Sequence, residues 1–126
     1  MFTEDDVIYA YTRAQAIADG VLMDVTQTAR EAGFRYPVAL TQVVWWEYVE
    51  VLAGVEGQDE RGRLWDILVL LHVAIRGTKG KSELRFRLHV RNDNRPGTPP
   101  LVELKAVCGP DDDGSPCLTV MRVDED

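Results

Sequence analysis

Apolar residues are most concentrated between Leu64 and Ile75, where ten of twelve positions are hydrophobic. They recur at three- and four-residue intervals, which predicts a helix. One row consists of Leu64, Ile67, Leu68, Leu71 and Ile75, and a second of Trp65, Val69 and Val73. A helix that is apolar nearly all round is expected to be a buried central element. The run is too short for a bilayer, which needs about 20 apolar residues, and Arg76-Gly77 is typical of a helix end.

A second pattern, strict alternation, runs from Glu83 to Arg91 and predicts a strand with one apolar and one basic face. Leu84, Phe86, Leu88 and Val90 alternate with Arg85, Arg87, His89 and Arg91. Two further strands are predicted at Leu101–Cys108 and Cys117–Val123. Because the links are short, the three strands are expected to form an antiparallel meander, since parallel pairing needs a longer crossover.

The N-terminal half contains shorter signals. Phe2 to Gly20 is predicted to be helical; alternatively, Thr12 caps a separate helix, Arg13–Asp19. The later predicted elements are an extended piece at Val21–Val25, a helix at Gln27–Ala32, a loop or edge strand at Phe34–Leu40 and a helix at Gln42–Val51. Pro37, which lacks a backbone donor, is the reason for the loop or edge strand.

These elements predict an α+β fold in which three or four helices pack on one face of a three-stranded antiparallel sheet. The length of 126 residues fits a single domain, 1–126, that is helical over 1–77 and a β meander over 83–123. No basic segment followed by an apolar stretch opens the chain, so no signal peptide is expected and the default location is the cytoplasm.

The net charge of −7 is unevenly distributed. Residues 1–75 carry 5 basic and 12 acidic side chains (−7), residues 76–95 carry 7 and 2 (+5), and residues 96–126 carry 2 and 7 (−5). The acidic clusters are Glu4-Asp5-Asp6, Asp111-Asp112-Asp113 and Asp124-Glu125-Asp126. They are interpreted either as an ordinary soluble surface or as a patch for a basic partner. Direct binding to nucleic acid is disfavoured, because it needs positive surface against phosphate.

The basic row Arg85, Arg87, His89 and Arg91 is the most functional-looking surface. It is either a solvated sheet face or an anion-binding surface. In the first case, Glu103 is expected near His89 and Lys105 near Arg87. Trp45 and Trp46 cannot share a helix face, so one is expected in the core; an exposed Trp46 is either a rim contact or a binding anchor.

Cysteine and histidine chemistry is sparse. Cys108 and Cys117 flank the acidic turn, where they can face each other, and are expected to be reduced thiols. Their spacing fits no zinc site, and a Cys–His pair requires His72 or His89 in reach. His72 is expected to be a hydrogen-bonded core histidine. The acidic turn lacks the alternating ligands of a calcium loop, and no nucleotide-binding or hydrolase motif is found. No cofactor or metal is predicted.

Several segments resemble a family of small uncharacterised proteins carried on plasmids, prophages and other mobile elements. The matching segments are Tyr11–Gly20, Ala29–Phe34, Pro37–Thr41, Gly57–Glu60, Leu64–Asp66, Arg91–Asn94 and Leu104–Pro110. The similarity covers nearly the whole chain but brings no catalytic residues. It implies a genetic context in which small acidic proteins inhibit host defence, as anti-CRISPR proteins do.

The leading hypothesis is therefore a non-enzymatic inhibitor of a host defence complex, a monomer or small homo-oligomer in the bacterial cytoplasm. Acidic surface would bind a nucleic-acid-handling protein such as a CRISPR effector complex where nucleic acid docks. The alternative is a small enzyme or anion-binding module that uses the basic face 85–91, with a thiol. A structural accessory protein of the mobile element is a third hypothesis. The candidate partner-binding residues are Glu4, Asp5, Asp6, Asp111, Asp112, Asp113, Arg85, Arg87, Arg91 and Trp46.

Overall fold

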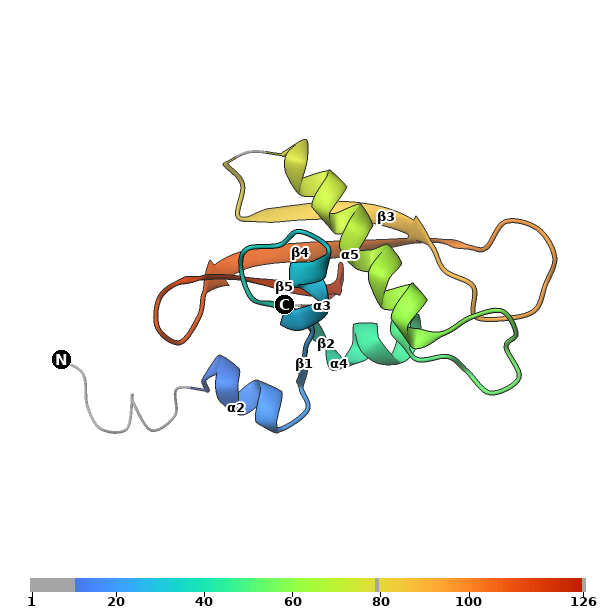
Figure 1. The fold of residues 1–126 in the computed structure, drawn as a ribbon, viewed down its shortest axis with the longest axis horizontal. Coiled ribbons are helices and arrows are strands. Elements are labelled where there is room, and N and C mark those ends of the chain that lie inside the picture. Colours follow the sequence, from blue (N-terminus) through green and yellow to red (C-terminus); the bar gives the residue numbers. More distant parts are fainter. Residues whose placement is uncertain (1–10, 79, 126) are drawn as a thin grey trace.

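One long helix, α5 (Glu60–Arg76), lies across a five-stranded sheet in the computed structural model, which describes residues 11–78 and 80–125 (Figure 1). The helix contains the predicted segment but starts four residues earlier. Asp59 sets this start, because its Oδ1 accepts a hydrogen bond from the Gly62 N–H at 2.7 Å. Gly77 caps the other end. The apolar row through Ile67, Leu68 and Leu71 is fully buried against the sheet.

The three predicted strands are present as β3 (Glu83–His89), β4 (Leu101–Pro110) and β5 (Pro116–Arg122), paired antiparallel in that order. The prediction of a three-stranded antiparallel sheet is nevertheless wrong. β2 (Val38–Thr41) pairs in parallel with β5, and β1 (Leu22–Asp24) pairs antiparallel with β2. The sheet is therefore mixed, in the order β1-β2-β5-β4-β3.

The sequence predicts only a loop or edge strand where β2 lies, because Pro37 precedes it. Pro37 lacks a donor, but its carbonyl accepts from the Leu118 N–H at 2.9 Å, so the proline joins the parallel ladder. Val38, Ala39 and Leu40 then follow with 0% exposure. A run that is buried on both faces shows no alternation, which is typical of an inner strand. Two strands therefore lie within the segment 1–77 that was predicted to be helical.

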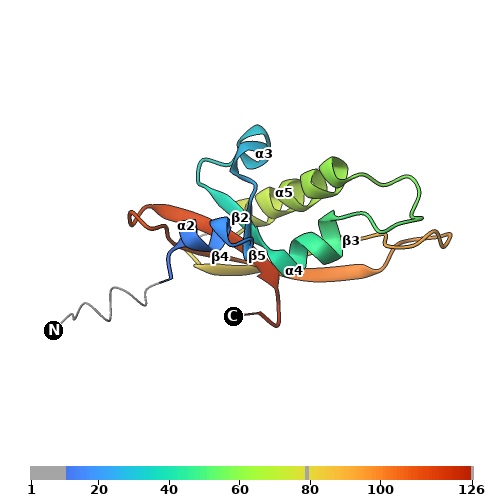
Figure 2. The same cartoon turned by 90° about the horizontal axis from the view of Figure 1, so that it is seen from below.

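The remaining helices of the described residues are short, so the prediction of three or four helices packed together on one face is also wrong. They are α2 (Arg13–Ala18), α3 (Thr26–Glu31), α4 (Gln42–Val44) and the π-helical turn η1 (Trp45–Val49). α3 and α5 lie on the same side of the sheet (Figure 2). α2 lies against the other side, because Arg13 bonds to the hydroxyl of Thr119, whose side chain alternates with the core-facing Leu118 and Val120.

The N-terminal half agrees with the second of the two helix predictions. Thr12 caps α2: its Oγ1 accepts from the Gln15 N–H at 3.0 Å and its own N–H donates to Gln15 Oε1 at 2.9 Å. Residues 1–10, where the longer helix was predicted to begin, lie outside the described residues. Within the part of the chain that is described, no helix has the length and apolar content needed to span a membrane.

The expectation that α5 is buried all round is wrong. Trp65, Leu70 and Val73 are 39%, 39% and 60% exposed. A helix that packs on a single sheet layer buries only the side that faces the sheet. The second apolar row of α5 therefore faces outward.

Candidate functional sites

The acidic turn Asp111–Asp113 is part of the fold. Asp112 accepts hydrogen bonds from the backbone N–H groups of Arg13 at 2.8 Å and Ala14 at 3.0 Å, so it caps α2 from a distant part of the chain. Hydrogen bonds from the side chain and backbone of Ser115 lower the pKa of the Asp113 carboxyl below its ordinary value. The turn is exposed, yet one of its three carboxylates is committed to a helix end.

The C-terminal acids are also bonded within the protein. Asp124 accepts from the guanidinium of Arg122 at 2.8 Å. Glu125 accepts from the Thr41 hydroxyl at 2.8 Å and from the Arg122 N–H at 2.7 Å. The third cluster, Glu4-Asp5-Asp6, and the last residue, Asp126, lie outside the described residues. Internal contacts thus use most of the carboxylates that the structure describes in the predicted acidic surface.

Two arginines of the basic row on β3 contact the same acidic residue. Arg85 and Arg87 approach the carboxylate of Glu103 at 3.5 and 3.2 Å. The strand register places Glu103 opposite Arg87 and Lys105 opposite Arg85, so the expected pairs were two residues out of register. Both arginine side chains are more than half exposed, and such pairs add little stability, about 0–1 kcal/mol. One carboxylate between two guanidinium groups leaves this face positively charged.

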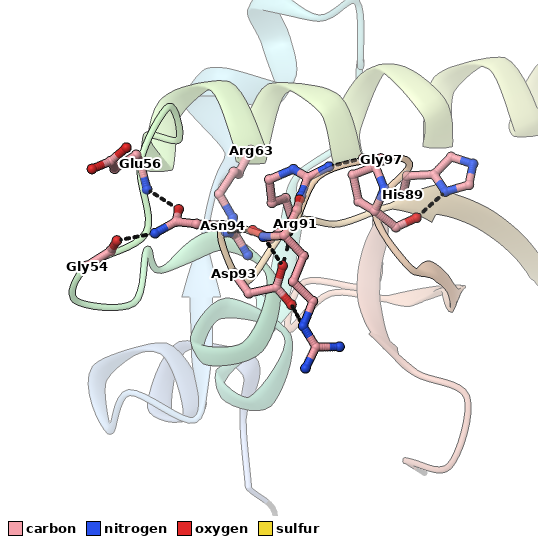
Figure 3. Close-up of polar contacts among 10 residues, drawn as sticks. Gly54, Glu56, Arg63, His89, Arg91, Asp93, Asn94 and Gly97 are labelled. Carbon is pink, nitrogen blue, oxygen red and sulfur yellow. Dashed lines mark hydrogen bonds and ion pairs between the residues drawn. The ribbon is translucent and has the colours of Figure 1, made fainter.

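Arg91 does not extend the basic face. Its guanidinium donates to the backbone carbonyls of Arg95 and Gly97 and lies 3.9 Å from the Asp93 carboxylate. His89, also predicted in the row, makes a 2.8 Å contact from Nδ1 to the Pro99 carbonyl. Both side chains therefore shape the loop between β3 and β4 (Figure 3).

A buried arginine that the sequence did not indicate holds the same end of the molecule together. Arg63 is 6% exposed and donates from Nε to the Tyr48 carbonyl at 2.8 Å and from Nη1 to the Arg91 carbonyl at 2.8 Å. Its Nη2 donates to Asn92 Oδ1 at 2.6 Å. Burial lowers the pKa of the guanidinium. One signal was available: Arg63 lies four residues before Ile67, on the buried row of α5.

A neighbouring asparagine fixes the loop that leads into α5. Asn94 Oδ1 accepts from the Glu56 N–H at 2.8 Å, and its Nδ2 donates to the Gly54 carbonyl at 2.7 Å. Figure 3 shows these contacts between the two loops. The acidic loop that follows η1 is thus held beside the first turn of the long helix.

The tryptophans separate as the sequence predicted. Trp45 packs against the core, whereas Trp46 is 54% exposed. On α5, Trp65 is a further exposed tryptophan that the sequence placed in the core. The exposed carboxylates Glu60 and Asp66 lie on the same helix, within five residues of Trp65. The described surface therefore combines an aromatic ring with acidic groups on α5.

The two thiols lie on opposite faces of the sheet. In the register of β4 and β5, Cys108 is opposite Leu118 and Cys117 is opposite Gly109, an offset of one residue. Because successive side chains alternate between faces, the cysteines do not face each other, and both are free. Burial raises the pKa of the Cys117 thiol. Among the described residues, no three His, Cys, Asp or Glu side chains gather as metal ligands.

A cavity of about 320 Å³ lies between α5, the loop after α3 and the core-facing side of the sheet. His72 lines it and packs edge-on against Phe34, with ring centroids 5.3 Å apart. The sequence predicted that His72 is hydrogen-bonded, but its nitrogens bond to none of the described residues. Cys108 of β4 also lines the cavity. Sequence reasoning did not find this cavity, because its walls come from five separate parts of the chain.

Over the described residues, these features define a small α+β protein with a mixed five-stranded sheet and one long helix. The chain belongs to a family of unknown function, DUF6573, whose sequence model matches residues 1–126. No curated protein and no solved structure matches the chain.

Proposed function

We propose that this protein is a non-enzymatic binding protein that docks on a basic, nucleic-acid-handling protein through the outer side of α5. The observation that carries this proposal is the exposure of Trp65, Leu70 and Val73 on the one long helix. Exposed apolar groups that gather on one element are typical of interaction surfaces. Tryptophan is also among the residues that contribute most to binding energy at interfaces.

The charge around this helix supports a basic partner. From Glu50 to Glu60 the chain carries four acidic residues and no lysine or arginine. All four are exposed, and Asn94 ties this loop to the loop between β3 and β4. Asp66 adds a fifth exposed carboxylate one turn into the helix, and Arg61, the arginine next to Glu60 in the sequence, lies 4.0 Å from Glu31. Acidic groups around an apolar anchor steer a positively charged surface into contact.

This proposal keeps the expected acidic surface but moves it to a different part of the chain. Asp112 and Glu125 serve as internal hydrogen-bond acceptors, whereas Glu56, Glu60 and Asp66 are exposed in the loop before α5 and in its first two turns. The resemblance to proteins of mobile elements further suggests the partner: a CRISPR effector or a similar defence complex in the bacterial cytoplasm. Binding would then block the channel where the complex holds nucleic acid.

The test is binding to purified CRISPR effector complexes, with free DNA as competitor. Trp65→Ala should weaken binding by about thirtyfold, the effect of losing a central aromatic anchor. Tyr11→Ala is the matched control, because Tyr11 is 58% exposed and lies outside α5. The double variant Glu60→Gln/Asp66→Asn should slow association more than it speeds dissociation, and the difference from the parent should shrink as salt rises.

The proposal fails if DNA and the protein bind one complex together, or if Trp65→Ala and Tyr11→Ala behave alike. If the protein binds none of the effector complexes tested, this class of partner is excluded. Circular dichroism and urea unfolding of each variant separate a lost contact from a lost fold, because all four substituted side chains lie at the surface.

A further inference from the structure

The cavity beside His72 has the size and wall chemistry of a small-molecule site. Its floor is the core-facing side of the sheet at Leu84, Ala106 and Leu118, and one side is formed by Ile75 of α5. The opposite side is the chain from Gly33 to Tyr36. A volume of about 320 Å³ lies at the lower end of the range for ligand pockets, and mostly apolar walls with a few polar groups are their usual composition.

The rim of the cavity carries two cations. Arg35 and Lys81 line it and are exposed, and within the described part of the chain neither lies within 4.0 Å of a carboxylate. Glu83 also lines the rim, but its carboxylate is 3.9 Å from Lys105. The charge of Glu83 is thus matched by Lys105, and the positive charges of Arg35 and Lys81 remain at the opening. Apolar walls beneath a positive rim match a ligand with an apolar body and a single anionic head.

We infer that this cavity binds a small organic monocarboxylate with an aromatic or branched aliphatic body. The body contacts Phe34, Ile75 and Leu118 inside the cavity, and the carboxylate lies at the rim between Arg35 and Lys81. A planar guanidinium binds a carboxylate through two parallel hydrogen bonds, which gives the arginine geometric as well as electrostatic selectivity. A sugar or a free phosphate is a poor match, because its polar groups would meet apolar walls without partners.

This site is separate from the outer side of α5 that is proposed to dock on a protein. Ile75 and His72 are directed toward the cavity, whereas Trp65 and Val73 are exposed on the helix. The two proposals are therefore tested by different variants and different ligands, and the failure of one does not decide the other.

The experiment is a titration of the full chain with 3-phenylpropionate and with its neutral amide, followed by ¹H–¹⁵N NMR and calorimetry. The carboxylate should bind at least about tenfold more tightly than the amide, since only the acid carries the charge that the rim recognises. Amide-signal shifts should centre on residues 33–36, His72 and residues 81–84. 4-Methylpentanoate and 4-methylpentanamide repeat the comparison with a branched aliphatic body.

Two classes of variant locate the site. Arg35→Gln and Lys81→Gln should each reduce the affinity for the carboxylate several-fold and leave the affinity for the amide unchanged. Arg95→Gln is the matched control, because Arg95 is also an exposed arginine but lies in the loop beyond β3. Ala106→Leu fills the floor of the cavity and should abolish binding of both ligands.

Equal affinity for acid and amide would overturn the inference, as would equal effects of Arg35→Gln and Arg95→Gln. Shifts that centre away from the cavity, or no binding of either acid, would overturn it as well. If Ala106→Leu does not fold, the two rim variants still decide, because both rim side chains are exposed and their loss leaves the core intact.

Discussion

The side chain of Arg63 donates a hydrogen bond to the backbone carbonyl of Tyr48 across 2.8 Å, which joins α5 to the last turn of η1. The same guanidinium reaches the Arg91 carbonyl and the Asn92 side chain. All of these acceptors are neutral. A buried cation that is held only by neutral oxygens is costly to desolvate. Arg63 is retained here because it satisfies a carbonyl of η1 and a carbonyl of the loop after β3 at once.

Replacing Arg63 should therefore destabilise the protein. Arg63→Leu is expected to lower the free energy of unfolding by about 2–4 kcal/mol, because the partly buried carbonyls of Tyr48 and Arg91 lose their donor. Arg63→Lys should recover only part of this loss, since an ammonium group cannot span the separated acceptors. Urea unfolding measures both. Arg61→Leu, at an exposed position two residues away, is the control and should stay within about 0.5 kcal/mol of the parent; equal effects at both positions would contradict the structural role of Arg63.

Gly33 lies at the start of the loop after α3 with a φ of 102°, and a Cβ placed there would lie 3.1 Å from His72 Nε2. Left-handed backbone strain alone should lower the free energy of unfolding by about 1–2 kcal/mol. Gly33→Ala should lower it further, because the added methyl group crowds the imidazole. Gly54→Ala isolates the backbone effect, since Gly54 has a φ of 86° with nothing within 4 Å of the added atom. Thermal unfolding of the two variants gives the difference. Adding His72→Ala to Gly33→Ala should relieve the clash, and a double variant that gains nothing would place the cost in the backbone alone.

Asp112 caps α2 although the two lie at opposite ends of the chain. Asp112→Ala should reduce the free energy of unfolding by about 0.5–2 kcal/mol, the usual effect of removing a helix cap. Asp66→Ala removes an exposed carboxylate that caps no helix and should have a much smaller effect on unfolding by urea. An Asp112→Ala variant as stable as the parent would show that this carboxylate is free to contact a partner.

The buried thiol of Cys117 should make stability fall at alkaline pH. Burial raises its pKa above the ordinary value of 9.0, so the folded protein retains the proton that the unfolded chain releases. Above pH 9.0 the folded state therefore binds more protons than the unfolded state, and the free energy of unfolding decreases as pH rises through this window. Unfolding by urea at a series of pH values measures the slope. Cys117→Ala should show a shallower alkaline slope, and parallel curves for the two proteins would refute this assignment.

Local periodicity is sufficient to predict the helices and strands that bury one of their sides against the core. The helix at Glu60–Arg76 and the strand at Glu83–His89 follow from spacings of three to four residues and of two, which any sheet-packed helix or half-buried strand must show. Thr12 as a cap and the antiparallel order of β3, β4 and β5 follow from equally local signals, a capping residue and short links. The separation of Trp45 from Trp46 follows in the same way from the geometry of a helix.

Contacts between distant segments decided the rest. Whether Val38–Thr41 becomes an edge or an inner strand depends on β5, which meets it only in the folded chain. Tertiary contacts likewise turned Asp112 from a surface acid into a cap, buried Arg63 beneath two loops, and brought the cavity walls together at His72. The sequence determined which segments are amphipathic, because that property is encoded by neighbouring residues. The tertiary structure decided which charged groups stay free, because a charge is neutralised or exposed only by what packs beside it.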